Sequence, residues 1–169
     1  TKTIANIGGT GIKIDDLVET TNHFKCFDYI INTVDEQLTE DYVKKLHSIL
    51  KAGTSSEYNE YAPVGRYKVF ENEVGQIATA AVDQVEEAMY SLLLGYNFKK
   101  EKDLAYLASF HARFEQIHPF ADGNGRVGRL ILYKECLKEG ITPFIVDDTR
   151  KADYYNALEQ FQVYENHQP

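Results

Sequence analysis

The chain has 169 residues, of which 43% are hydrophobic and 26% are charged, a composition typical of a soluble globular domain large enough to form a core. A formal net charge of −8 at pH 7 argues against a broad surface for DNA or RNA, although an acidic protein can still bind a nucleotide where a few cations gather. No apolar run approaches the roughly 20 residues that span a bilayer. We therefore expect neither a nucleic-acid partner nor a membrane partner.

The two cysteines, Cys26 and Cys136, are far apart and form no CxxC pair. Their spacing argues for a reducing compartment and against a disulfide scaffold or a zinc site. No signal peptide is visible in the sequence, so the expected location is the cytoplasm.

Most of the chain has the periodicity of amphipathic helices, in which apolar residues recur every three or four positions. Thr39 is a suitable N-cap for one of these helices, and Gly53 is a suitable end. Another helix, at 104–117, carries a stripe of apolar residues typical of a core-facing surface, which makes the neighbouring His111 a structural residue. The predicted helices cover residues 14–34, 38–53, 79–97, 104–117, from the G-N-G sequence to about 139, and 150–165.

Residues 53–75 break this pattern. They contain one proline, three glycines and a short β-prone run from Tyr67 to Phe70, bounded by Gly65 and Asn72. This composition predicts a loop with a small irregular hairpin; the alternative is a solvated connection between helices. The sequence therefore predicts a single, mainly α domain over residues 1–169 with one small β-hairpin.

Residues 118–129, HPFADGNGRVGR, combine a histidine, a carboxylate, a glycine-rich turn and two arginines ahead of an apolar run. A glycine-rich turn that leads into a helix presents unpaired backbone N–H groups and the positive end of the helix dipole, which together suit phosphates. Arg126 and Arg129 lie three residues apart and extend this anion site. Asp122 is placed to hold Mg²⁺ between phosphate oxygens, and His118 to accept a proton near neutral pH.

Each of these residues also has a simpler interpretation. A histidine before a proline, such as His118, is typical of a surface or capping residue, Asp122 is typical of a helix cap, and G-N-G is typical of a tight turn. Their occurrence together at one loop–helix junction favours the nucleotide site.

The same stretch resembles the signature of the Fic domain, HxFx(D/E)GNGRxxR. The matching residues are His118, Phe120, Asp122, Gly123, Asn124, Gly125, Arg126 and Arg129. The helix at 104–117, the hairpin at 53–75 and the YYNAL sequence at 154–158 also lie where Fic proteins keep their counterparts. The resemblance implies a Fic-type helical bundle whose hairpin is a flap, and it covers nearly the whole chain.

This resemblance implies an enzyme that transfers AMP from ATP to a Ser, Thr or Tyr hydroxyl of a target protein, or of the chain itself. It implies that His118 is the base, that Asp122 binds Mg²⁺ and that Phe120 points into the core. The residues implied to contact the phosphates are Gly123, Asn124, Gly125, Arg126 and, for the γ-phosphate, Arg129.

Two further sets of residues follow from the same resemblance. Tyr154, Tyr155 and Gln162 fall where the family lines the adenine pocket, although an amphipathic terminal helix would bury tyrosines in any case. The flap would hold the target segment by main-chain pairing, along an edge formed by Tyr67, Lys68, Val69 and Phe70.

Residues 1–12 resemble the inhibitory helix of many Fic proteins, (S/T)xxxE(G/N), whose glutamate pairs with the second arginine of the motif. Thr1 and Asn6 match this pattern, but Ala5 occupies the glutamate position. The resemblance implies an enzyme released from inhibition; the alternative is an unrelated N-terminal turn.

Three rival functions stay open. A Doc-like kinase, which transfers the γ-phosphate, has lysine in place of the second glycine, so Gly125 favours AMP transfer. Removal of AMP by the same site is the second alternative. A non-catalytic nucleotide-binding module is the third, and the presence of both His118 and Asp122 argues against it because such a module needs neither a base nor a metal ligand.

Overall fold

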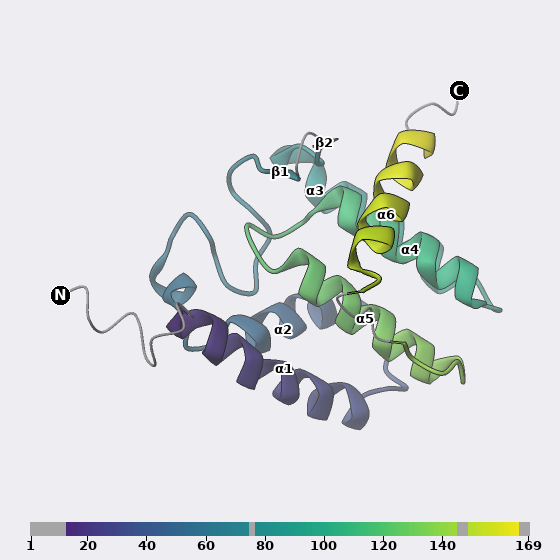
Figure 1. Cartoon of the computed structure of the whole chain (residues 1–169), viewed down its shortest axis with the longest axis horizontal. Helices are drawn as coiled ribbons and strands as arrows, with labels where there is room; N and C mark the ends of the chain where they lie inside the picture. The colour runs from purple at the N-terminus through teal and green to yellow at the C-terminus, as the bar shows by residue number, and fades with distance from the viewer. Residues whose placement is uncertain (1–12, 75–76, 145–148, 166–169) are drawn as a thin grey trace.

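The computed structural model describes residues 13–74, 77–144 and 149–165, and within them the chain is mainly helical, which confirms the predicted fold class (Figure 1). The α-helices of these segments are α1 (Ile14–Asn32), α2 (Glu40–Lys51), α3 (Val85–Phe98), α4 (Leu104–Ile117), α5 (Asn124–Lys138) and α6 (Lys151–Glu165). Between α2 and α3 lie two short 3-10 helices, Ser55–Tyr58 and Val82–Gln84, and the antiparallel strands β1 (Glu73–Val74) and β2 (Ile77–Ala78), with Glu73 opposite Ala78. No helix in the described segments is both long enough and apolar enough to cross a membrane.

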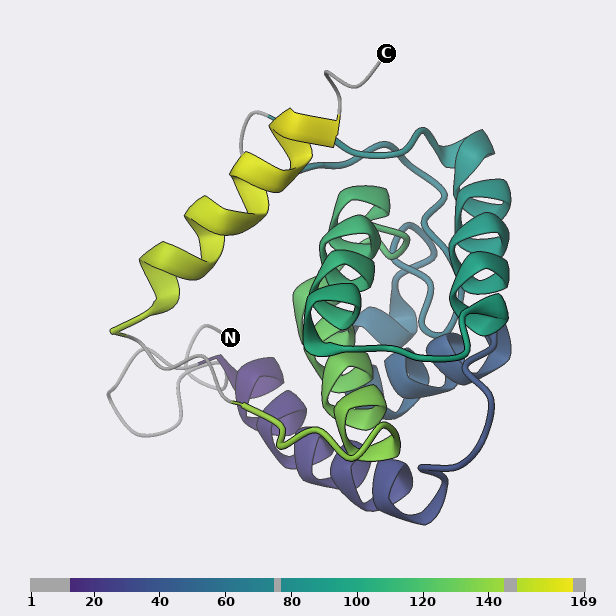
Figure 2. The same ribbon diagram turned by 90° about the vertical axis from the view of Figure 1, so that its right-hand side faces the viewer.

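Helix α5 is the central element of the bundle. It packs against α4 and also against α1 and α2, while α3 and α6 both pack on α4 (Figure 2). The core between these helices consists of fully buried apolar side chains, including Leu46, Met89, Phe114 and Ile131. Phe120, in the loop that joins α4 to α5, belongs to the same core. The motif loop is therefore anchored in the interior.

Local hydrogen bonds explain where the helices begin. The Thr39 hydroxyl caps α2 by accepting a bond from Tyr42 N–H (3.2 Å), and Asp103 caps α4 through Tyr106 N–H (2.8 Å). The bounds of α4 agree with the prediction. The third helix starts at Val85, later than the predicted position 79, because β2 and a 3-10 turn occupy residues 77–78 and 82–84.

The hairpin is displaced from its predicted position, because residues 67–70 form no strand. Tyr67 and Lys68 are buried instead. The Tyr67 hydroxyl donates to Glu40 (3.0 Å), and Lys68 N–H donates to the carbonyl of Pro119 in the motif loop (2.8 Å). The prediction of a strand at this run is wrong, because burial against the motif loop outweighs its β propensity.

Candidate active site

The motif crosses from one central helix to the next. Helix α4 ends at Ile117, and α5 begins at Asn124 after Gly123, whose φ of 85° suits glycine. His118 adopts φ 52° and ψ 60°, and it is the one residue other than glycine with positive φ in the described segments. A left-handed histidine is uncommon, and such backbone strain is concentrated at functional sites.

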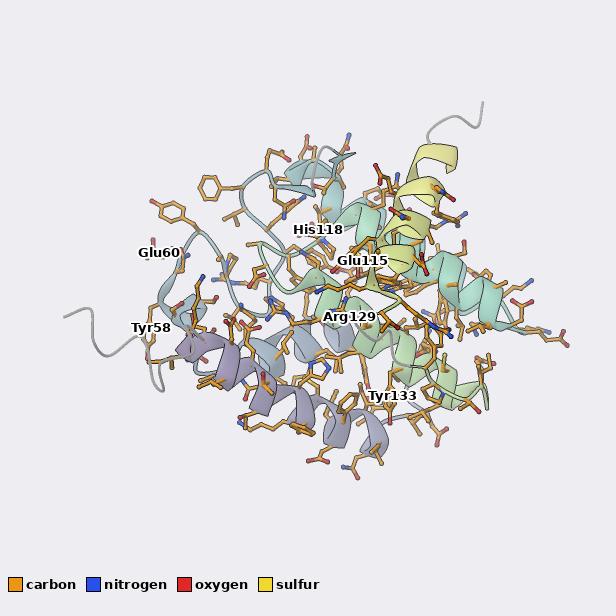
Figure 3. The ribbon with its side chains drawn as sticks, in the orientation of Figure 1. Tyr58, Glu60, Glu115, His118, Arg129 and Tyr133 are labelled. Carbon is orange, nitrogen blue, oxygen red and sulfur yellow. The ribbon has the colours of Figure 1, made fainter. Side chains whose placement is uncertain are left out.

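The His118 side chain is half-buried at the end of α4 (Figure 3). Its Nδ1 lies 3.3 Å from the carbonyl oxygen of Glu115, so the tautomer that donates this bond leaves Nε2 as an acceptor. Burial lowers the pKa of the imidazole and Lys68 lowers it further, while the Glu115 carbonyl and Asp122 act in the opposite direction. The environment therefore favours a neutral imidazole whose Nε2 can accept a proton.

The start of α5 offers open backbone donors. The first hydrogen bond into this helix runs from Val127 N–H to the Gly123 carbonyl (3.0 Å), so the N–H groups of residues 124–126 have no acceptor within the helix. Phosphate groups bind well at such a helix start. An anion bound at this helix start would therefore be held by backbone groups.

The side chain of Asn124 orders the loop. It is buried, its Oδ1 accepts a bond from Phe120 N–H (2.8 Å), and its Nδ2 donates to the Phe120 carbonyl (2.8 Å). The resemblance implied that Asn124 contacts phosphate, but in the structure both groups of its amide hold the loop backbone.

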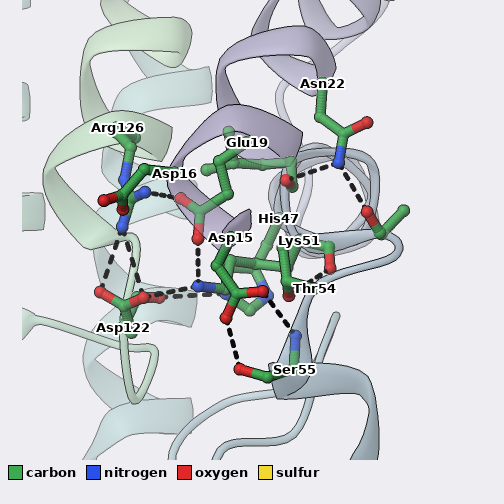
Figure 4. Close-up of polar contacts among 12 residues, drawn as sticks. Asp15, Asp16, Glu19, Asn22, His47, Lys51, Thr54, Ser55, Asp122 and Arg126 are labelled. Atoms are coloured by element: carbon green, nitrogen blue, oxygen red, sulfur yellow. Dashed lines mark hydrogen bonds and ion pairs between the residues drawn. The ribbon is translucent and has the colours of Figure 1, made fainter. Parts of the chain in front are cut away.

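Asp122 belongs to an ionic network that reaches α1 and α2 (Figure 4). Lys51 Nζ lies 2.5 Å from Asp122 Oδ2 and 2.7 Å from Glu19 Oε1, and Arg126 pairs with both carboxylates. Burial would raise the pKa of Asp122, but the hydrogen bond and charge of Lys51 bring it below its usual value. The capping interpretation of Asp122 is wrong, because Gly123 holds the N-cap position of α5.

The Asp122 carboxylate suits magnesium. Its side chain is 56% exposed, it is ionised, and Mg²⁺ commonly takes one or two protein carboxylates together with phosphate oxygens. No group of three or more histidine, cysteine, aspartate or glutamate side chains forms a metal cluster in the described residues. A metal at this position would therefore depend on the nucleotide for its other ligands.

His47 was missed by the sequence reasoning, although it joins three parts of the site. Its Nδ1 accepts a bond from Gly65 N–H (2.8 Å), and its Nε2 lies 3.1 Å from the Asp122 carbonyl. The ring stacks flat on Phe120, with centroids 4.0 Å apart, and burial lowers its pKa to about 4. A neutral His47 therefore positions the motif loop against the 59–72 loop.

A largely apolar cavity of about 300 Å³ lies between α1, α5 and α6, and both Arg129 and Tyr154 line it. Its other lining residues include His23, Phe27, Tyr133 and Phe144. The Tyr154 hydroxyl lies 2.6 Å from His111 Nε2, so His111 anchors α6 on α4. Tyr155 is 53% exposed.

The other predicted positions are distributed as follows. In the flap run, Tyr67 and Lys68 face inward, whereas Val69 and Phe70 are half-exposed. The backbone of Gln162 lies in α6, and its side chain lies outside the described part of the structure. Ala5 lies outside the described residues altogether.

Comparison with known proteins gives these features a family context. The family model described as Fic/DOC family matches residues 37–136. The chain is 30% identical over 99 residues to a protein adenylyltransferase Fic of Nematostella vectensis, which covers 57% of this chain and 23% of that protein. It is 38% identical over 53 residues to the protein of the same name from Drosophila melanogaster, covering 31% and 11%. The matched part therefore spans less than a quarter of these relatives.

Solved structures agree with this result. A Fic domain containing signaling protein from Bacteroides thetaiotaomicron matches with a TM-score of 0.78 and 25% identity, over 88% of this chain and 58% of that one. Fic-1 from C. elegans matches with a TM-score of 0.72 at 19% identity, over 89% and 45%, and this second match concerns the fold alone. Because the family model covers more than half of the chain and ends within α5, the chain belongs to the Fic/DOC family.

Proposed function

We propose that the chain transfers AMP from ATP to a Ser, Thr or Tyr hydroxyl of a protein. The observation that carries this proposal is the position of His118, a half-buried imidazole whose Nδ1 lies at the Glu115 carbonyl, one short loop ahead of the backbone N–H groups at the start of α5 that have no acceptor within the helix. A proton acceptor beside a phosphate cradle is what phosphoryl transfer to a hydroxyl requires. The relatives named protein adenylyltransferase Fic support the same activity.

In the proposed mechanism, His118 Nε2 accepts the proton of the target hydroxyl while the hydroxyl oxygen attacks the α-phosphorus of ATP. The bond between the α-phosphorus and the oxygen that leads to the β-phosphorus breaks, and pyrophosphate leaves. The N–H groups of residues 124–126 stabilise negative charge on the phosphate oxygens, and Arg129 binds the γ-phosphate. If Mg²⁺ is bound, Asp122 would hold it, and the ion would neutralise part of the triphosphate charge.

The remaining assignments concern recognition. We propose that Tyr154, Tyr155 and Gln162 contact the adenine, and that the exposed Val69 and Phe70 contact the target segment. The hydroxyl of Tyr154 is already bonded to His111, so its contribution to adenine binding would come from the ring face.

The decisive experiment uses ATP labelled separately at the α- and γ-phosphate, with Mg²⁺ and candidate target proteins, and the His118→Ala variant as control. Retention of α-label on protein by the unmodified chain alone supports AMP transfer. Retention of γ-label instead would establish a kinase. Binding of ATP without retention of either label would reduce the chain to a nucleotide-binding module.

A further inference from the structure

Lys68 is a buried cation that has no role in the mechanism proposed above. Its residue exposure is 3%, and lysine is almost never buried to this extent unless it is paired with a carboxylate. Its Nζ donates to two neutral acceptors, Asn72 Oδ1 (2.6 Å) and Thr79 Oγ1 (2.8 Å). Among the side chains that the structure describes, no carboxylate lies within ion-pair distance of this ammonium. Its charge is therefore stabilised by these two hydrogen bonds and, from beyond ion-pair distance, by the negative charge of Glu71.

The contacts of Lys68 hold the motif loop directly after His118. Its backbone N–H donates to the carbonyl of Pro119, the residue directly after His118 (2.8 Å). Asn72, held by the Lys68 ammonium, donates through Nδ2 to the carbonyl of Phe120 (3.0 Å). Two consecutive carbonyl groups of the motif loop are thus bound by one small unit formed by Lys68 and Asn72.

The unit formed by Lys68 and Asn72 also joins the β1–β2 hairpin to the motif loop. The Thr79 hydroxyl, just after β2, contacts both the backbone carbonyl and the Oδ1 of Asn72 at 2.8 Å. A change in Lys68 would therefore alter the base, the motif loop and the root of the hairpin together. These contacts place Lys68 between the segment proposed to hold the target and the residue proposed to deprotonate it.

We propose that Lys68 is a positioning residue for His118, which acts through its buried positive charge and through the loop contacts that hold the histidine in its left-handed turn. Lys68 touches neither the nucleotide nor the target in this role. The inference rests on the proposed AMP transfer, in which His118 must be unprotonated to accept a proton.

The charged groups that act on His118 have opposite effects. From the hairpin side, Lys68 disfavours a second proton on the imidazole; from the motif loop, Asp122 favours it, as does the Glu115 carbonyl on α4. Burial of the ring acts in the same direction as Lys68 and more strongly. Removal of the Lys68 charge should leave Asp122 and the carbonyl less opposed, so the histidine would become protonated at a higher pH.

The test compares Lys68→Met with Lys68→Arg, which retains the charge, and with Lys44→Met as a matched control. Lys44 is a second lysine beside the same loop, stacked 4.2 Å above the Tyr67 ring and paired with Glu40 (3.3 Å), and it is not among the groups that act on His118. The measurement is an NMR titration of the His118 ring protons, assigned by their loss in His118→Ala.

We expect the His118 titration midpoint to rise in Lys68→Met and to stay near that of the unmodified protein in the other two variants. In the transfer assay, the rate of Lys68→Met at pH 6 relative to pH 8 should fall by roughly threefold more than that of Lys44→Met. An unchanged midpoint in folded Lys68→Met would overturn the proposal, as would an equal rise in Lys44→Met.

If circular dichroism shows that Lys68→Met is unfolded, Lys68→Gln, which keeps a donor for Asn72, answers the same question. The titration needs no substrate, so it reports on Lys68 whether or not AMP transfer is observed. If the His118 midpoint rises in Lys68→Met as expected but no transfer is observed, the result would count against the proposed function and not against the effect of Lys68 on His118.

Discussion

Gly128 of α5 lies so close to Glu115 of α4 that a side-chain carbon at position 128 would be 2.5 Å from Glu115 Oε1. The same carbon would lie 3.0 Å from Cε1 of His111, one turn earlier on α4. Both of these side chains are buried. The absence of a side chain at Gly128 is therefore what allows the two helices that flank the motif loop to approach each other.

Gly128→Ala should destabilise the protein by roughly 1–3 kcal/mol, because the Glu115 carboxylate and the His111 ring must both move. Gly95→Ala is the matched control, since Gly95 lies within α3 and a side-chain carbon there meets no atom within 4 Å. That control should instead gain about 0.5–1 kcal/mol from helix propensity. Urea denaturation of the two variants measures the difference. Similar effects of both substitutions on the free energy of unfolding would show that α4 and α5 can accommodate a side chain at position 128.

Glu115 should make the stability of the protein depend on pH. It is nine-tenths buried, its Oε1 has no hydrogen-bond partner among the described residues, and burial raises its pKa from 4.5 to about 7 even though Arg129 opposes the shift. Between these two pH values the folded state retains a proton that the unfolded state releases. The unmodified protein should therefore lose stability at this site as the pH rises from about 4.5 through 7.

Glu115→Gln removes this dependence because the amide does not ionise. The free energy of unfolding of Glu115→Gln, relative to that of the unmodified protein, should therefore rise by about 2 kcal/mol between pH 5 and pH 8. Urea denaturation at several pH values measures it. Glu139→Gln is the control for loss of a carboxylate, at the end of α5 where Glu139 pairs with Lys102 (3.4 Å). A difference that stays constant with pH at position 115 would contradict the assignment.

Local signals were sufficient to predict much of the fold. The apolar stripe along 104–117 predicted the bounds of α4, and helical periodicity, with Thr39 and Gly53 at the ends of one helix, placed most of the other helices to within a few residues. The hairpin was misplaced because Tyr67 and Lys68 have the composition of a strand but are held by Glu40 and Pro119, which are distant in sequence. Such tertiary contacts override β propensity.

The candidate site was predicted only in part, for the same reason. The 118–129 motif lies in one continuous stretch, so its spacing is visible in the sequence. The partners of Asp122 are not, because Lys51 lies 71 positions away from it and Glu19 a further 32. A lysine at the end of an amphipathic helix is normally expected to be solvated. No local signal in the sequence distinguishes Lys51 from Lys45, which lies earlier in the same helix. Only the packing of α1 and α2 against α5 brings this network together.

His118→Ala should reduce AMP transfer by about 100-fold or more while leaving ATP affinity nearly unchanged, because the imidazole acts on the target hydroxyl. Label transfer and isothermal titration with ATP measure the two quantities. His47→Ala is a useful comparison, because His47 holds the Asp122 carbonyl and the Gly65 N–H and its loss should weaken ATP binding as well. Loss of ATP affinity in His118→Ala would exclude the role of base.

Asp122→Ala should lose transfer activity, and raised Mg²⁺ should restore it poorly, because the carboxylate is the proposed protein ligand of the metal. Asp15→Ala provides a control carboxylate nearby, which accepts hydrogen bonds from the N–H and hydroxyl of Ser55 on the adjacent 3-10 helix. Rates measured across a range of Mg²⁺ concentrations, with Mg²⁺ affinity determined in the presence of a non-hydrolysable ATP analogue, separate binding from turnover. Normal turnover in Asp122→Ala would remove this residue from the metal site.

Ala5→Glu should suppress AMP transfer if residues 1–12 are an inhibitory helix that has lost its glutamate. A carboxylate at position 5 would pair with Arg129 and compete with the γ-phosphate for the same guanidinium, whereas alanine leaves it free. A partly buried pair of this kind is worth roughly 1.4–3 kcal/mol, which corresponds to about a tenfold to hundredfold lower rate. Ala5→Gln is the matched control, because its side chain has nearly the same shape without the charge, and it should retain most of the activity. Arg129→Ala should be poorly active with either residue at position 5, because its phosphate contact is lost in both. Equal rates for Ala5→Glu and Ala5→Gln would show that the N-terminal segment does not regulate the site through this arginine.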